Sequence, residues 1–246
     1  QIKQDVHMLF MSATPIPRTL NLALSKVKQI SSILTPPTNR EGVVTFLKEE
    51  SDTIIKEAIL REKRRGGQVF FISNKIATIE QNKKYLYQLL GENNIKIEVI
   101  HSKIPPKKAE QIIEDFELKK FDILLATSII ESGIHLPNAN TIIVKNANNF
   151  GIADLHQLRG RVGRSKIKGY CYFIVKNKDE LNDNAIKRLV ALEKNSHLGS
   201  GEVLAMRDLE IRGGGNLIGE DQSGHIKQIG YGLYLRILED AIISLS

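Results

Sequence analysis

Short apolar runs alternate with amphipathic segments along most of the chain. The apolar runs are nearly continuous, which is typical of strands that helices cover on both faces. They predict five or six strands between residues 42 and 176, over residues 42–49, 67–73, 95–101, 121–127, 140–146 and 169–175. The first of these has the character of an edge strand. The amphipathic segments predict helices over residues 52–65, 76–90, 105–120, 152–162 and 181–194.

Strands that alternate with helices of this length form βαβ units. We therefore expect an α/β fold with a parallel sheet flanked by helices. A further strand over residues 6–13 and a helix over residues 18–26 precede this region. After about residue 180 the pattern changes. A glycine-rich polar loop over residues 199–225 and a last helix over residues 231–245 are predicted there as a separate appendage.

The charge balance favours a polyanionic partner. The 246 residues include 35 Lys and Arg against 28 Asp and Glu, which gives a net charge of +7. Such an excess is typical of proteins that bind nucleic acid, although a generally basic surface gives the same count. The single cysteine, Cys171, excludes an internal disulfide and fits a reducing compartment. No apolar run approaches the roughly 20 residues of a membrane helix.

The stretch QLRGRVGRS, residues 157–165, places three arginines close together. On a helix at about 100° per residue, Gln157, Arg161 and Arg164 share one face and the apolar residues lie opposite. Arg159 falls between the faces and is expected to pair internally. Two guanidiniums and a carboxamide on one face suit a phosphate, because arginine forks onto phosphate oxygens with paired hydrogen bonds. A solvated basic helix face is the alternative.

The rest of a nucleotide site is missing from the sequence. No P-loop of the form G-x-x-x-x-G-K-[ST] occurs, and no Asp-Glu pair that would hold Mg²⁺ ends an apolar strand. Gly213, Gly215 and Gly219 miss the G-x-G-x-x-G spacing, which argues against a Rossmann-type enzyme. An ATP site built on these arginines would be half of a complete site. A nucleic-acid-binding module without a motor role is the alternative.

Four stretches resemble the motifs of superfamily 2 helicases and translocases. QLRGRVGRS resembles the sixth motif, and LLATSIIESGIHLPNANTIIV (residues 124–144) resembles the fifth. FMSATPIPRTL (residues 10–20) resembles the third motif in the form of the RecG-like branch. DLEIRGGGNLIGEDQSG (residues 208–224) resembles the translocation motif of that branch. SATPIPRTL, HQLRGRVGRS and IGYGLYLRILEDAI favour the members that couple DNA repair to transcription over the fork-reversal helicases.

The resemblance implies how the chain divides, since two RecA-like lobes sandwich ATP in this branch. Residues 1–29 would be the last strand and helix of the first lobe. Residues 30–180 would be the second, helicase C-terminal lobe, a RecA-like parallel sheet of the P-loop NTPase type. Residues 181–246 would form a helical translocation module of a hairpin and a loop. The chain begins with Gln in a charged stretch, so we expect a piece of a longer protein.

The matched motif positions imply the site residues. Arg161 and Arg164 would contact the ATP phosphates across the cleft as the catalytic arginines. The other nucleotide-binding positions are Glu131, Gly133 and Gln157. The DNA-binding positions are Ser102, beside His101, then Thr127, Ser128, Arg212 and Gln222, of which the last two would couple lobe closure to stepping. The positions that transmit the state of the ATP site are Ser12, Ala13 and Thr14. Thr127 and Ser128 could instead simply cap the helix that follows their strand.

The sequence departs from the family pattern at three places. His135 stands where the family usually has Asp, and a neutral imidazole brings no negative charge. Ser102 stands where Gly is usual, which weakens the case for a backbone contact with phosphate there. Asn148 and Asn149 stand where an acidic residue or a histidine is more usual.

The resemblance implies an ATP-dependent translocase of double-stranded DNA that displaces stalled RNA polymerase in transcription-coupled repair. ATP and Mg²⁺ would be its cofactors, with the P-loop and the Mg²⁺ ligands in the first lobe and no metal ligand in this chain. Its partners would be double-stranded DNA, the first lobe and, through other domains, RNA polymerase and excision-repair proteins. No membrane is implied, and the location would be the bacterial cytoplasm, at the nucleoid. A RecG-like fork-reversal helicase and a non-motor module are the alternatives.

Overall fold

A six-stranded parallel sheet forms the centre of the computed structural model, which describes residues 42–91, 93–127, 139–163, 167–196 and 200–211, with positions 9 and 31. Its order is β1-β6-β5-β2-β4-β3, and every neighbouring pair is parallel. The strands are β1 (Val44–Glu49), β2 (Gln68–Ser73), β3 (Ile97–Ile100), β4 (Ile123–Thr127), β5 (Ala139–Lys145) and β6 (Tyr170–Val175).

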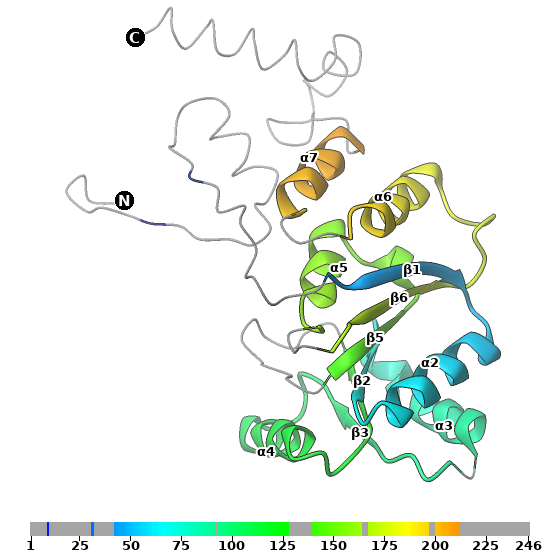
Figure 1. Ribbon diagram of the computed structural model, residues 1–246, viewed down its shortest axis with the longest axis vertical. Helices are drawn as coiled ribbons and strands as arrows, with labels where there is room; N and C mark the ends of the chain where they lie inside the picture. Colours follow the sequence, from blue (N-terminus) through cyan, green and yellow to red (C-terminus); the bar gives the residue numbers. More distant parts are fainter. Residues whose placement is uncertain are drawn as a thin grey trace, which may run out of the picture.

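Helices cover both faces of the sheet (Figure 1). The helices are α2 (Asp52–Arg64), α3 (Ile79–Leu90), α4 (Pro106–Glu117), α5 (Ile152–Arg159), α6 (Asp183–Lys194) and α7 (Gly201–Ile211), with short 3₁₀ turns η1 (Ile76–Thr78) and η2 (Ala147–Asn149). Successive strand residues belong to two separate cores, because side chains alternate across a strand. Phe70 and Ile72 pack with α4, α5 and α6, whereas Val69 and Phe71 pack with α2 and α3.

The crossovers diverge at the boundary between β2 and β5. These two strands are neighbours in the sheet. The chain leaves β2 for α3 on one face and leaves β5 for α5 on the opposite face. The carboxyl ends of β2 and β5 are therefore a point where the loops part, which in open α/β sheets opens a crevice.

Most of the predicted elements are confirmed within the described residues. Ser51 is the N-cap of α2, Gly91 ends α3 at φ 54°, and Pro106 begins α4. β1 lies at the edge of the sheet as predicted. That edge is partly covered, because the Leu47 amide donates to Glu193 Oε1 of α6 at 2.8 Å. Covering an edge strand removes a template for aggregation.

Two predictions were wrong. The helix predicted over residues 152–162 ends at Arg159, and the loop predicted from residue 199 contains the helix α7. Leu204 and Ala205 of α7 are buried, so burial fixes a helix where the glycines had suggested a loop. The elements predicted over residues 6–13, 18–26 and 231–245 lie outside the described residues.

A buried carboxylate ties α2 to β5 at the amino end of the sheet. Glu62 is fully buried, accepts a hydrogen bond from Thr141 Oγ1 at 2.6 Å, and pairs with Arg65 Nη1 at 3.3 Å. The backbone of Gly67 passes so close that a Cβ there would overlap Glu62 Oε1. Gly67 lies three residues after α2, and a side chain there would displace the Glu62 carboxylate.

We predict that Gly67→Ala lowers the free energy of unfolding by about 2–3 kcal/mol, because it displaces the buried Glu62 from Thr141. In Glu62→Ala/Gly67→Ala the overlap is gone, so the double variant should lose at least ~1 kcal/mol less than the sum of the single variants. Urea unfolding of the four proteins measures this. Additive losses would show that Glu62 and Gly67 do not interact.

Candidate nucleotide and nucleic-acid interface

Helix α5 carries the first three residues of the arginine stretch, Gln157 to Arg159. It begins after Gly151, whose amide donates to Asp154 Oδ2 at 3.3 Å. Ile152 and Leu155 are buried against the sheet, and Gln157 is exposed. The helix therefore presents Gln157 to the outside, as its apolar pattern predicts.

Arg159 is a structural residue. Its side chain is 4% exposed and donates to the Leu192 carbonyl at 2.7 Å, to His156 Nδ1 at 2.8 Å and to Ser200 Oγ at 3.1 Å. These bonds join α5 to the end of α6 and to the residue before α7. The prediction that Arg159 pairs internally is confirmed.

His156 is held as a neutral hydrogen-bond acceptor. Arginine can only donate, so Nδ1 accepts and the ring proton is on Nε2. Burial, and then the positive charge of Arg159, lower the pKa of His156 to about 4. Burial also lowers the pKa of Arg159, which remains charged because its ordinary pKa is so high.

The segment after Arg159 is a tight turn and not a helix. Arg161 N donates to the Leu158 carbonyl at 3.0 Å, and Gly163 then adopts φ 68°. A Cβ on Gly163 would stand 3.0 Å from Val43 Cγ2 and 3.3 Å from Gly169 Cα. This close approach turns the chain toward β6. The helical projection that placed Gln157, Arg161 and Arg164 on one face is therefore wrong beyond Arg159.

Arg161 is the partly exposed member of a segment that is otherwise fixed. Arg159 before it is buried by its hydrogen bonds, and Val162 and Gly163 after it are buried against the sheet. Arg161 itself is half-buried. The backbone of Arg161 is therefore held on both sides, while the residue as a whole stays partly exposed.

Thr127 and Ser102 lie at the carboxyl edge of the sheet on neighbouring strands. Thr127 is the last residue of β4, and Ser102 lies in the exposed turn after β3, where Ile104 N donates to the His101 carbonyl at 3.0 Å. β3 and β4 pair through Ile100 and Ala126. The sheet thus brings the two predicted DNA-binding positions side by side. Thr127 Oγ1 is buried and has no hydrogen-bond partner within the described residues.

The remaining predicted site residues lie outside the described part of the chain, and their roles stay predictions. They are Ser12, Ala13, Thr14, Ser128, Glu131, Gly133, Arg164, Arg212 and Gln222, together with the departure at His135.

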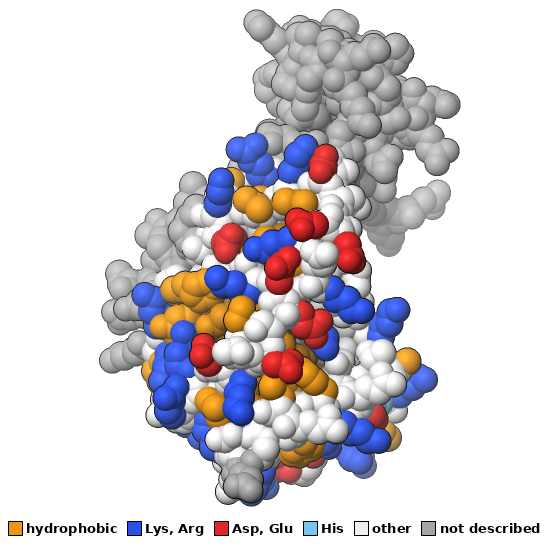
Figure 2. Space-filling model, turned by 90° about the vertical axis from the view of Figure 1, so that its right-hand side faces the viewer, with side chains coloured by type: hydrophobic (Ala, Val, Ile, Leu, Met, Phe, Trp, Pro, Cys, Tyr) orange, Lys and Arg blue, Asp and Glu red, His pale blue; other side chains and the backbone are white. Residues whose placement is uncertain are grey.

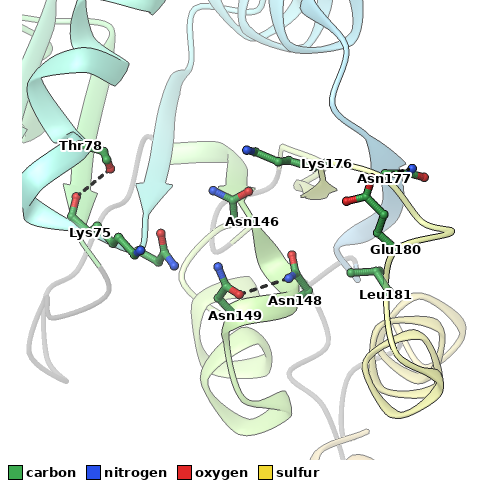
Figure 3. Close-up of a pocket in the computed structure, with 10 residues that line it drawn as sticks. Lys75, Thr78, Asn146, Asn148, Asn149, Lys176, Asn177, Glu180 and Leu181 are labelled. Carbon is green, nitrogen blue, oxygen red and sulfur yellow. Dashed lines mark hydrogen bonds between the residues drawn. The ribbon is translucent and has the colours of Figure 1, made fainter.

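A polar pocket at the ends of β2, β5 and β6 was not predicted from the sequence. Its volume is about 360 Å³. Its lining residues are Asn74, Lys75, Thr78, Asn146, Asn148, Asn149, Lys176, Asn177, Glu180 and Leu181 (Figure 3). The one available signal was the pair Asn148 and Asn149, noted only as a departure from the family pattern.

Charge is mixed on the side toward which β1 points in Figure 1. Lys and Arg side chains there are interspersed with Asp and Glu (Figure 2). Among the described residues, no group of three or more His, Cys, Asp or Glu could hold a metal ion. Within the same part of the chain, no helix is both long and apolar enough to span a membrane.

The fold and a family match define the class of this protein. Residues 50–166 match the model of the helicase conserved C-terminal domain. That range runs from the end of β1 through the arginine stretch, and the six-stranded parallel sheet has the architecture of a RecA-like helicase C-terminal lobe.

Similar proteins indicate which branch of the helicases the chain resembles. The chain is homologous over its whole length to bacterial transcription-repair-coupling factors. It is 60% identical over 246 residues to the factor of Helicobacter pylori strain J99, covering 100% of this chain and 24% of that protein. It is 43% identical over 244 residues to the factor of Escherichia coli K12, covering 99% and 21%. The chain thus spans about a quarter of the length of these relatives.

A solved structure of RecG bound to a three-way DNA junction is also similar. It aligns with a TM-score of 0.69 and 28% identity, covering 96% of this chain and 32% of that chain. The resemblance inferred from the motif order is therefore confirmed.

The two motif glycines should differ sharply in their tolerance of a side chain. Gly163→Ala should lower the free energy of unfolding by roughly 1–2 kcal/mol, because a left-handed backbone disfavours a Cβ. Gly160→Ala is the matched control: its nearest neighbours would be 3.4 and 3.5 Å away, and its φ is −67°. Urea unfolding compares the two, and equal losses would show that the turn at Gly163 is not required.

The pH dependence of stability should report on His156. The pKa of His156 is about 4 in the folded protein and 6.5, the ordinary value for histidine, in the unfolded chain. The unfolded chain therefore takes up the proton first as the pH falls. The stabilisation is present above pH 6.5 and is lost toward pH 4, by up to ~1.4 kcal/mol per pH unit. In His156→Gln, which still offers Arg159 an acceptor, this component should disappear from the unfolding free energy. An unchanged pH profile would contradict the assignment.

Proposed function

We propose that the chain is the second motor lobe of an ATP-dependent translocase of double-stranded DNA that acts in transcription-coupled repair. The placement of Arg161 carries the proposal. The half-buried Arg161 stands on a backbone that buried Arg159 fixes on one side and Val162 and Gly163 fix on the other. A surface cation needs no such support, whereas a group that must meet a reacting phosphate does.

The donor set suits the phosphates of ATP. A guanidinium is a fixed charge with a forked set of donors, which matches phosphate oxygens. Arg161 and Arg164 would hold the phosphates and stabilise the charge that develops during transfer to water. Gln157, exposed on α5, would contact the same nucleotide, with Glu131 and Gly133. The P-loop and the Mg²⁺ ligands would come from the first lobe, and ATP with Mg²⁺, when bound, would supply the phosphoryl group that is transferred to water.

The carboxyl edge of the sheet supports the DNA contacts. Thr127 ends β4 there and Ser102 lies in the turn after the neighbouring strand β3, and the net charge of +7 favours a polyanion. Together with Ser128, Arg212 and Gln222 they would contact the DNA backbone. Ser12, Ala13 and Thr14 would transmit the state of the ATP site to this edge.

The relatives support the biological role. At 60% identity the chain is nearer to a transcription-repair-coupling factor than to RecG, at 28%. The intact protein would use DNA translocation to displace stalled RNA polymerase and would recruit excision-repair proteins through other domains, in the bacterial cytoplasm at the nucleoid. Fork reversal is the second candidate, because the RecG structure on a DNA junction covers 96% of this chain.

In the full-length protein, Arg161→Ala and Arg164→Ala should each reduce ATP turnover by ~10³-fold or more, the range of an arginine finger. Duplex DNA affinity without nucleotide should stay within about twofold, because DNA lies at the other site. Arg64→Ala, an exposed arginine at the end of α2, is the control for loss of charge. Wild-type turnover in Arg161→Ala would remove the finger role.

The 246-residue chain alone should hydrolyse no ATP, with or without DNA, because its sequence contains no P-loop. Phosphate release from the purified chain measures this, with the full-length protein as the positive control. DNA-stimulated hydrolysis by the chain alone would overturn the division into lobes.

A further inference from the structure

The pocket at the ends of β2, β5 and β6 has the position of a ligand site. Its walls come from three loops. Asn74, Lys75 and Thr78 follow β2, and Asn146, Asn148 and Asn149 follow β5. The loop after β6 contributes Lys176, Asn177, Glu180 and Leu181. β2 and β5 are the neighbours whose crossovers run to opposite faces. Open α/β sheets bind ligands at this switch point, outside the carboxyl ends of the strands. Its volume of about 360 Å³ lies in the roughly 300–1,000 Å³ range of small-ligand sites.

The floor of the pocket is a fixed turn that presents three asparagines. Asn146 has a left-handed backbone, with φ of 52°. Asn tolerates this conformation better than most residues do, and such conformations are concentrated at functional sites. The turn then closes through Asn149 N donating to the Asn146 carbonyl at 3.0 Å, and Ala147 beneath it is fully buried. Figure 3 shows Asn146, Asn148 and Asn149 between Lys75 on one wall and residues 176–181 on the other.

The lining is rich in hydrogen-bond donors and positive in charge. The lining contains two lysines, Lys75 and Lys176, and one carboxylate, Glu180. Glu180 Oε1 already accepts from Asn177 Nδ2 at 3.2 Å, so one of its oxygens has a partner within the lining. Asn148 Nδ2 donates to Asn149 Oδ1 at 3.2 Å, so the two amides are aligned as one polar group. Ammonium and amide donors around one cavity suit an anion with several oxygens.

We propose that this pocket binds a phosphate group through Lys75, Lys176 and the asparagine turn. The site is separate from the arginine segment assigned to ATP and from the DNA contacts at the ends of β3 and β4. Thr127 pairs with Ser73 across β4 and β2, so the pocket begins one strand beyond the predicted DNA contacts. The phosphate can belong to a nucleic-acid backbone or to a free nucleotide or inorganic phosphate. The volume leaves room for an attached sugar.

The salt dependence of duplex binding tests whether the bound phosphate belongs to the DNA backbone. The measurement uses the full-length protein without nucleotide. Lys75→Ala and Lys176→Ala should each reduce the slope of log affinity against log salt by ~0.9, the value for one lost phosphate contact. Lys96→Ala removes the same charge from an exposed position before β3, at the amino edge of the sheet, and should leave the slope unchanged. Asn148→Asp should weaken binding more than Gln88→Glu, which adds the same charge to the exposed surface of α3.

Hydrogen exchange locates the ligand and separates the sources. Duplex DNA, or inorganic phosphate at constant ionic strength, should protect peptides that contain residues 146–149 and 176–181. Protection by DNA with the slope changes assigns a backbone phosphate, and protection by inorganic phosphate alone assigns a free one. Protection by neither, with slopes equal to that of Lys96→Ala, would overturn the proposal. Because no ATP is turned over, the result is independent of the role of Arg161.

Discussion

The burial of the Arg159 guanidinium is the constraint on which the arrangement of the site depends. Removing a charge from water is costly unless hydrogen bonds replace the lost solvation. Here the replacements are the Leu192 carbonyl, the Ser200 hydroxyl and the His156 ring. They come from α5, from the end of α6 and from the residue before α7. The Arg159 side chain therefore joins α5, the end of α6 and the residue before α7 to one another.

The neighbours of Arg159 follow from this. His156 is neutral when it accepts this hydrogen bond, because burial and then the positive charge of Arg159 lower its pKa to about 4. Val162 and Gly163 pack behind the turn, where the absence of a side chain lets Gly163 approach Gly169. Two arginines separated by one glycine thus differ in burial. Arg159 is buried and joins three segments, whereas Arg161 in the turn that follows is partly exposed.

The sequence predicted the elements well where local pattern decides them. The strands and most helices match because burial on both faces leaves continuous apolar runs, and the internal role of Arg159 followed from its place between the helix faces. Predictions failed where distant contacts decide. Nothing local to Gly163 indicates that Gly169 lies against it, so the helix was extended too far. The glycines around α7 led to the prediction of a loop, whereas burial of Leu204 and Ala205 stabilises a helix there.

In the candidate site too, local motifs predicted individual residues, whereas their arrangement depends on distant contacts. Motif order predicted Ser102, Thr127 and Arg161 as site residues, and the strand order was needed to place Ser102 near Thr127. The polar pocket could not be predicted, because it is lined by loops that are far apart in sequence and meet only when β2, β5 and β6 lie side by side. Asparagine also carries no distinctive motif, and only the left-handed backbone of Asn146 marks the turn as unusual.

The central claim is that the arginine turn completes an ATP site shared with another lobe. The most direct measurement is a structure of the full-length protein with a non-hydrolysable ATP analogue, Mg²⁺ and duplex DNA. The account predicts guanidinium nitrogens of Arg161 and Arg164 within ~3.2 Å of phosphate oxygens, with the turn at Gly163 unchanged. Closed lobes with both arginines directed into solvent, away from the nucleotide, would contradict it.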